Sequence, residues 1–200
     1  MVKSLDQVYT EFAKVSNKSF GGWIGGLDKP WLVEFLQQIP TPKTVLEIGI
    51  FMGGTSNILL FLTGNSKYYG IDSWNAGDHQ AKPAYTTLKE GFLDTTAWAK
   101  DRITLVEGDS TVIGKTWNTP VDLLFIDGDH DYETARADIE NFSKWIPVGG
   151  YMLIDDYEME GVIRAADELV RFSDSWEKLR IPDYGKKGDS EKIFAARRIK

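Results

Sequence analysis

The densest group of residues able to do chemistry surrounds the end of an apolar run at Ile48. Phe51 occupies the place where a dinucleotide-binding turn, G-x-G-x-x-G, needs its second glycine so that the backbone can approach a pyrophosphate. The nucleotide-binding string G-x-x-x-x-G-K-S/T is also absent from the sequence. The turn therefore favours a ligand that carries an adenosine and no phosphate. Its polar residues and glycines are Glu47, Gly49, Gly53, Gly54, Thr55 and Ser56.

A second apolar run ends in Gly70–Trp74 and supplies another acid. Asp72 is suited to hold ribose hydroxyls through charge-assisted hydrogen bonds, and Glu47 to receive a cationic ammonium group. Trp74 is suited to pack on an adenine ring. The alternative is that the glycine turn serves packing alone and that the acid beside it is incidental.

Two later apolar runs, LLFIDGDHDY and YMLIDDY, end in acids. We expect Asp127, Asp155 and Asp156 at neighbouring strand ends on one face, where crowded carboxylates raise one another's pKa values unless a cation separates them. Oxygen ligands favour Mg²⁺ or a similar hard cation. The alternative is that these acids cap helices. His130 follows closely, and histidine is the commonest general base, although a structural role is equally open.

These residues need strands to position them. From Thr44 onward, short apolar runs alternate with helical stretches, which is typical of βαβ units and a parallel sheet. Pro182–Glu191 is rich in turn residues and predicts a hairpin, so the final strand would be antiparallel. We predict an α/β fold that is Rossmann-like and doubly wound, with a mostly parallel seven-stranded sheet. The expected strands are Thr44–Ile48, Tyr68–Ile71, Ile103–Glu107, Leu123–Ile126, Tyr151–Ile154, Glu177–Ile181 and Lys192–Arg197.

Two helices and a glycine-rich segment precede this core. Apolar residues at helical spacing predict a first helix through Val8, Phe12 and Val15. Pro30, after a capping Asp28, opens a second helix that extends to about Ile39. The segment between them, at residues 19–26, is either a cover over a pocket or an ordinary turn. Residues 1–40 and 41–200 thus form the N-terminal part and the core of one domain.

Composition limits the function classes. A chain of 200 residues that is 42% hydrophobic suffices for one core, and the absence of cysteine excludes thiol chemistry. The net charge of -7 argues against nucleic acid as a partner. No apolar run approaches the roughly 18 residues that cross a bilayer, so we expect a cytoplasmic protein without a membrane partner. The expected partner is a small-molecule acceptor, and a homo-oligomer is left open.

Three motifs in order, ExGxxxGGTS from Glu47, GIDSW and EGDS, resemble those of class I S-adenosylmethionine-dependent methyltransferases. The resemblance implies that Glu47 and Gly49 hold the methionyl part of S-adenosylmethionine and that Asp72 holds the ribose. It also implies that Asp109 and Ser110 hold the adenine.

The stretch IDSWNAGDH is more similar to small-molecule and sugar O-methyltransferases of the macrolide and aminocoumarin tailoring type. The acids after the fourth and fifth strands resemble the metal site of catechol O-methyltransferase and related enzymes. This resemblance implies Mg²⁺ held by Asp127, Asp155 and Asp156, with Asp127 also near the cofactor, and Asp129 as the base. Two alternatives stay open: a metal-independent N- or O-methyltransferase, and a non-catalytic module that binds an S-adenosyl ligand.

Overall fold

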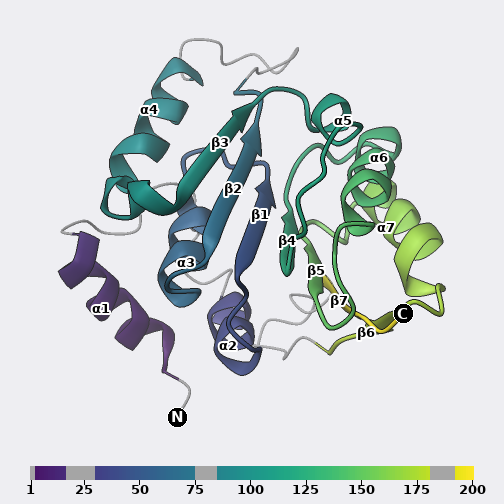
Figure 1. The fold of residues 1–200 in the computed structure, drawn as a ribbon, viewed down its shortest axis with the longest axis horizontal. Coiled ribbons are helices and arrows are strands. Elements are labelled where there is room, and N and C mark those ends of the chain that lie inside the picture. Colours follow the sequence, from purple (N-terminus) through teal and green to yellow (C-terminus); the bar gives the residue numbers. More distant parts are fainter. Residues whose placement is uncertain (1–2, 17–29, 75–84, 181–191) are drawn as a thin grey trace.

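The protein is built on a seven-stranded sheet with the strand order β3-β2-β1-β4-β5-β7-β6 (Figure 1). The computed structural model describes residues 3–16, 30–74, 85–180 and 192–200. β1 to β5 are parallel, and β7 is antiparallel to both of its neighbours, which confirms the predicted α/β fold with an antiparallel last strand. The strands are β1 Thr44–Ile48, β2 Lys67–Asp72, β3 Ile103–Glu107, β4 Leu123–Ile126, β5 Tyr151–Ile154, β6 Trp176–Lys178 and β7 Phe194–Arg198.

The predicted strand bounds hold best in the middle of the sheet. β1, β3, β4 and β5 begin and end where the apolar runs do, and β2 is one residue longer at each end. The last two strands differ from the predicted ranges because pairing sets their lengths. β7 begins at Phe194, which pairs with Ile154 at the end of β5, and β6 pairs with β7 at the edge of the described sheet. The connecting segment, with the predicted hairpin, lies outside the described residues.

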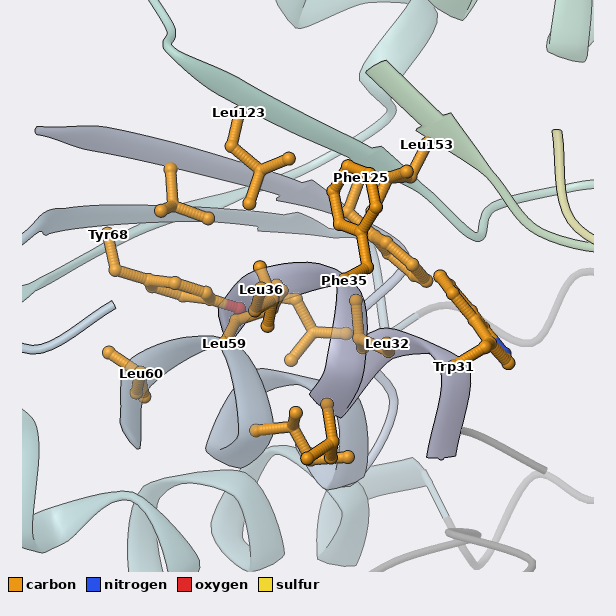
Figure 2. Packing of buried hydrophobic residues seen from close by; sticks show 14 of the residues in the cluster. Trp31, Leu32, Phe35, Leu36, Leu59, Leu60, Tyr68, Leu123, Phe125 and Leu153 are labelled. Atoms are coloured by element: carbon orange, nitrogen blue, oxygen red, sulfur yellow. The ribbon is translucent and has the colours of Figure 1, made fainter. Parts of the chain in front are cut away.

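Helices cover both faces of the sheet, and Figure 1 shows α2 and α3 on one side with α6 and α7 on the other. Alternate residues of β4 divide between the faces, as the two-residue period of a strand requires: Leu123 packs in one core and Leu124 in the other. Figure 2 shows the first core, where α2 and α3 meet the sheet. The helices are α1 Leu5–Ser16, α2 Pro30–Gln38, α3 Gly54–Leu62, α4 Tyr85–Thr95, η2 Ala97–Arg102, α5 Ser110–Ile113, α6 Tyr132–Ser143, α7 Glu160–Ala166 and η3 Asp167–Arg171.

The N-terminal helices form as the sequence predicts, with one exception in their packing. Val8 and Phe12 of α1 are buried, and the Phe12 ring lies 5.5 Å from that of Trp98, centroid to centroid. Val15 is 56% exposed, one residue before α1 ends. α2 begins at Pro30, where the missing amide hydrogen is harmless. The glycine-rich segment between α1 and α2 lies outside the described residues, and none of the described helices is long and apolar enough to span a membrane.

Candidate functional site

A cavity of about 510 Å³ opens at the carboxyl ends of β1 to β4. The strand order reverses between β1 and β4, and ligands of open α/β sheets bind at such a point. Among the described residues that line the cavity there is no lysine, arginine or histidine. The cavity therefore favours a ligand with positive charge and disfavours phosphates. Four of its lining residues are acids: Asp72, Asp109, Asp127 and Asp129.

The turn from β1 to α3 lies against the end of β4. Gly49 has a φ of +82°, and a Cβ there would stand 1.9 Å from the backbone oxygen of Asp127. Only glycine fits this position, so the turn can form one edge of the cavity. Gly53 also has a positive φ and precedes α3, where a Cβ would meet the Phe92 ring at 2.7 Å. Phe51 adopts a φ of 52° without being glycine, and it lines the cavity.

Asp72 fixes the shape of this turn. Its Oδ2 accepts hydrogen bonds from the backbone amides of Ile50 and Phe51, each at 2.8 Å, and its Oδ1 accepts one from Trp74 at 2.6 Å. A carboxylate has about four lone-pair sites, so capacity for a ligand hydroxyl remains. The sequence motif indicated a ligand contact for Asp72, but it gave no sign that Asp72 also holds the turn. The structure places Asp72 in the cavity wall, which is compatible with the predicted ribose contact.

Trp74 does not line the cavity. Its indole Nε1 donates to the backbone oxygen of Phe51 at 3.0 Å, and its ring packs beside Phe92. The ammonium of Lys89 lies 5.3 Å from the ring centroid. Trp74 thus braces the turn against α4, and the predicted stacking on adenine finds no support in this placement.

Glu47 lies in a buried polar cluster behind the turn. Its Oε2 accepts a hydrogen bond from the Ser56 hydroxyl at 2.6 Å and another from the hydroxyl of Tyr68, which Figure 2 shows pointing toward α3. Burial, and then the charge of Glu47, raise the pKa of Tyr68 well above its ordinary value. Of the five residues predicted as cofactor contacts in this turn, Gly49 alone lines the cavity; the others are Glu47, Gly53, Thr55 and Ser56.

The two residues predicted near adenine, Asp109 and Ser110, both line the cavity. Asp109 precedes α5, and its Oδ1 accepts hydrogen bonds from the backbone amide and the hydroxyl of Thr111, at 2.8 and 2.7 Å. The hydroxyl bond is the largest influence that lowers the pKa of Asp109. Ser110 lines the cavity beside it. Both residues thus lie at the cavity, and their contact with adenine stays a prediction.

A group of possible metal ligands adjoins the cavity. Ligand atoms of Asp127, His130 and Asp156 all lie within 4.8 Å of one another, and His130 Nε2 is 2.7 Å from Asp156 Oδ2. The predicted set contained Asp155 in place of His130. Asp155 instead accepts a hydrogen bond from the backbone amide of Asp156 at 3.1 Å and is not in the group. The Asp-x-x-His spacing at the end of β4 was the available signal for His130.

The two candidate bases differ in their surroundings. Asp129 lines the cavity, and its Oδ1 accepts a hydrogen bond from the His130 backbone amide at 2.7 Å. The His130 side chain is 44% exposed and reaches Asp156 at the end of β5. Asp129 therefore faces the cavity, whereas His130 faces the possible metal group.

Sequence reasoning missed Asp138, which lies on α6 next to the cavity wall. It is fully buried, and neither of its carboxyl oxygens makes a hydrogen bond of normal geometry within the described part of the chain. The signal was present, because Asp138 continues the buried helical stripe of Ala135, Ile139 and Phe142. An acid at an apolar position of a helix is exceptional and indicates a role beyond packing.

Comparison with known proteins agrees with this arrangement. A family profile described as a methyltransferase domain matches residues 46–157, more than half of the chain. A 115-residue segment is 28% identical to the uncharacterized protein R132 of Acanthamoeba polyphaga mimivirus. This segment covers 58% of the chain, and the chain spans about half the length of that curated relative, 52%.

Solved structures of methyltransferases share the fold at low sequence identity. The chain is similar to the O-methyltransferase TomG from Streptomyces achromogenes, which is bound to S-adenosylmethionine (SAM), with a TM-score of 0.64 and 16% identity, covering 100% of this chain and 92% of that one. A Bacillus cereus O-methyltransferase in complex with SAH has a TM-score of 0.59 and a sequence identity of 17%, and the match covers 97% of this chain and 90% of that one. CalS11, a TDP-rhamnose 3'-O-methyltransferase, has a TM-score of 0.60 and a sequence identity of 16%, and the match covers 96% of this chain and 93% of that one. On the evidence of the family profile, the chain belongs to the methyltransferase domain family.

Proposed function

We propose that this protein is an S-adenosylmethionine-dependent O-methyltransferase that uses a divalent metal ion and acts on a hydroxyl of a small molecule or sugar. The observation that carries the proposal is the shared position of Asp127. This residue lines the acidic cavity and also belongs to the group with His130 and Asp156. A methyl donor in the cavity and an acceptor beside that group would therefore meet at the end of β4.

The cavity suits the charge of S-adenosylmethionine. This cofactor carries a cationic sulfonium and an ammonium, and it has no phosphate. The four lining carboxylates would attract it, and the glycine at position 49 lets the turn at the cavity edge lie against the backbone of Asp127. TomG and the Bacillus cereus enzyme hold S-adenosylmethionine and its product in the same fold. A nicotinamide or flavin dinucleotide would bring a negative pyrophosphate to the same acids.

The donor set beside the cavity suits a divalent cation. Two carboxylates and an imidazole offer oxygen and nitrogen ligands, a combination that accepts Mn²⁺ or Zn²⁺ as well as Mg²⁺. A cation bound there would hold an acceptor hydroxyl and lower its pKa. Asp127, His130 and Asp156 would hold the ion in this arrangement. Asp155, as the sequence predicted, is the alternative third ligand, and His130 would then be free to act as the base.

In the arrangement that we propose, Asp129 is the base that removes the proton from the acceptor hydroxyl. Asp129 lines the cavity, so its carboxylate can reach an acceptor hydroxyl that lies between the methyl donor and Asp127. Transfer is a direct displacement: the hydroxyl oxygen bonds to the methyl carbon, the carbon–sulfur bond breaks, and the neutral thioether leaves. The donor is already activated, so positioning supplies most of the rate.

The acceptor class is inferred from the surroundings of the site and from similar proteins. The name of CalS11 states a sugar nucleotide substrate, and TomG takes part in the synthesis of tomaymycin, a small molecule. The net charge of -7 disfavours a nucleic-acid acceptor. We therefore propose a hydroxyl of a small molecule or sugar as the acceptor.

The metal assignment is tested with the neighbouring acids Asp155 and Asp156. Calorimetric titration of Mn²⁺ and Mg²⁺ into the protein should show binding, and Asp156→Ala should abolish it. Asp155→Ala is the matched control and should bind the metal normally. If Asp155→Ala loses the metal while His130→Ala keeps it, the ligand set is the one that the sequence predicted. Methyl transfer at full rate in excess chelator would contradict the metal mechanism and leave a metal-independent transferase.

The base is tested in the same preparations. Asp129→Asn should bind cofactor and metal normally and lower turnover by roughly 10²- to 10⁴-fold, the usual contribution of a general base. His130→Ala should lose metal affinity along with activity. If Asp129→Asn keeps near-native turnover and His130→Ala binds the metal but is inactive, the base is His130. Binding of the S-adenosyl ligand without methyl transfer to any hydroxyl compound would favour a binding module.

A further inference from the structure

Asp138 lies behind the cavity wall, against the loop that follows β4 and near Ser110 at the start of α5. A Cβ added to Gly128 would stand 3.4 Å from Asp138 Oδ2, so the carboxyl group lies directly against the loop that follows β4. The Ser110 hydroxyl, at the start of α5, is close enough to act on the charge of Asp138. Gly128 and Ser110 both line the cavity. One side chain on α6 thus contacts the wall through two separate loops.

The surroundings of Asp138 are unusual for an acid. Its exposed fraction is 0%, and neither carboxyl oxygen makes a hydrogen bond of normal geometry with the described residues, although the Ser110 hydroxyl lies near it. A buried polar group without a partner costs free energy, and such groups are rare in native proteins. An apolar residue at this helical position would avoid that cost. The acid therefore calls for a function that a leucine could not perform.

Charge and burial together keep a proton on Asp138. The pKa of Asp138 is raised to about 7, and burial is the largest cause, while the Ser110 hydroxyl acts in the opposite direction. The carboxylates that face it, Asp109 before α5 and both Asp129 and Asp131 before α6, contribute to the same rise. Near neutral pH, the protonated and charged forms are therefore both present.

We propose that Asp138 is a positioning residue of the cofactor pocket, whose protonated carboxyl group donates a hydrogen bond to the Ser110 hydroxyl and so orients that hydroxyl toward the ligand. The Ser110 oxygen would accept this bond, which leaves its own proton free to be donated to a ring nitrogen of adenine. This inference rests on the proposed S-adenosyl cofactor. It adds a residue that does not itself touch the ligand.

Loss of the proton should reverse the arrangement. A charged Asp138 would accept a hydrogen bond from the Ser110 hydroxyl. Ser110 could then no longer donate a hydrogen bond to the ring nitrogen of adenine. The new charge would also repel Asp109, Asp129 and Asp131, which lie on the loops that shape the cavity. Affinity for an adenosine ligand should therefore be highest below neutral pH and should fall as the pH rises through neutrality.

The test is the pH dependence of S-adenosylhomocysteine binding, measured by calorimetry at constant ionic strength with chelator present. The dissociation constant of the wild type should increase about tenfold between about pH 6 and pH 8.5, which is the effect of losing about one hydrogen bond. Asp138→Asn retains a donor without a titrating proton, so its affinity should match the low-pH wild type at every pH. Asp138→Ala should bind weakly throughout. A residue that only fills space would give no such rescue by asparagine.

The Ser110→Ala variant tests whether Asp138 acts through the hydroxyl. It should bind weakly with little pH dependence, and adding Asp138→Asn should have no further effect, because residues that act together are not additive. Independent, additive effects would overturn the proposal, as would a wild type whose affinity does not change with pH. A wild type that binds no S-adenosylhomocysteine at any pH would overturn this inference together with the proposed cofactor. Thermal unfolding of each variant shows whether it is folded.

Discussion

At the scale of single residues, an acid of the cavity wall can hold the fold together and also be the predicted ligand contact. Asp72 is the clearest case, because it accepts three backbone hydrogen bonds from the turn and also forms part of the cavity wall. A residue with only one of these roles could be replaced at a smaller cost. Sequence motifs identify Asp72 as a ligand contact, but they cannot reveal its backbone partners, which depend on how the turn folds back.

Asp72→Ala should weaken S-adenosylhomocysteine binding by about 1.5–3 kcal/mol, the range for hydrogen bonds to a charged group. Part of this loss of affinity should come from a less ordered turn, because the backbone amides of Ile50 and Phe51 would lose their hydrogen-bond acceptor. Titration calorimetry measures the change, and Asp101→Ala, an exposed acid on η2, serves as the matched control. Normal affinity in Asp72→Ala would show that this acid takes no part in binding.

Glu47 shows why side-chain placement was harder to predict than strand position. The neighbours Leu46 and Ile48 point into the core on the α6 side, so the alternation of β1 directs Glu47 to the opposite face, beneath α3. The motif alone associated Glu47 with the ligand. The alternation of side chains along the five residues of β1 places Glu47 on the face beneath α3. Tyr68, on the neighbouring strand β2, donates a hydrogen bond to Glu47 there.

At the scale of elements, the predictable part of the site lies directly at the strand ends. Asp109 and Asp127 come within two residues of a strand end, and the structure places both at the cavity. Trp74 lies in a loop, and its direction depends on contacts with α4 that no local pattern encodes. The grouping of Asp127, His130 and Asp156 likewise depends on the loop after β4, which turns His130 toward Asp156 at the end of β5.

The close contact between the β1–α3 turn and β4 gives a prediction at this scale. Gly49→Ala should destabilise the protein by more than about 3 kcal/mol, because its Cβ would overlap the backbone of Asp127 in addition to the strain of a positive φ. Gly64→Ala is the matched control: its φ is also positive, at +61°, but its Cβ would meet nothing within 4 Å. We expect a cost of only about 1 kcal/mol there.

Urea unfolding of the two variants compares these costs directly. The shared positive φ cancels in the comparison, so the difference between the variants reports the steric overlap with β4. Equal destabilisation in Gly49→Ala and Gly64→Ala would show that the turn does not lie as close to β4 as the structure places it.

At the scale of the whole molecule, the buried acid of α6 links the site to the stability of the fold. The folded-state pKa of Asp138, about 7, lies above the ordinary value of 3.8. Below the lower value, both folded and unfolded chains hold the proton. Between the two values, the unfolded chain loses it and the folded chain keeps it, so the free energy of unfolding falls as the pH rises. Above about pH 7 the loss is complete.

Asp138→Asn removes this titration. At pH 8 the variant should be more stable than the wild type, by at most about 4 kcal/mol at about 1.4 kcal/mol per pH unit between the two pKa values. Near pH 4 the difference should nearly vanish, because the wild-type acid is then protonated in the folded state. Urea unfolding at both pH values checks this expectation, and a difference that does not depend on pH would contradict it.

The central claim is that the acidic cavity binds an S-adenosyl cofactor and excludes dinucleotides. The most direct measurement is a pair of calorimetric titrations of the wild-type protein, with S-adenosylhomocysteine and with NADH under the same conditions. The four lining carboxylates, and a turn without the glycine pattern that binds a pyrophosphate, predict binding of one S-adenosylhomocysteine per chain and no measurable binding of NADH. Binding of NADH with equal or higher affinity, or no binding of S-adenosylhomocysteine, would contradict the account.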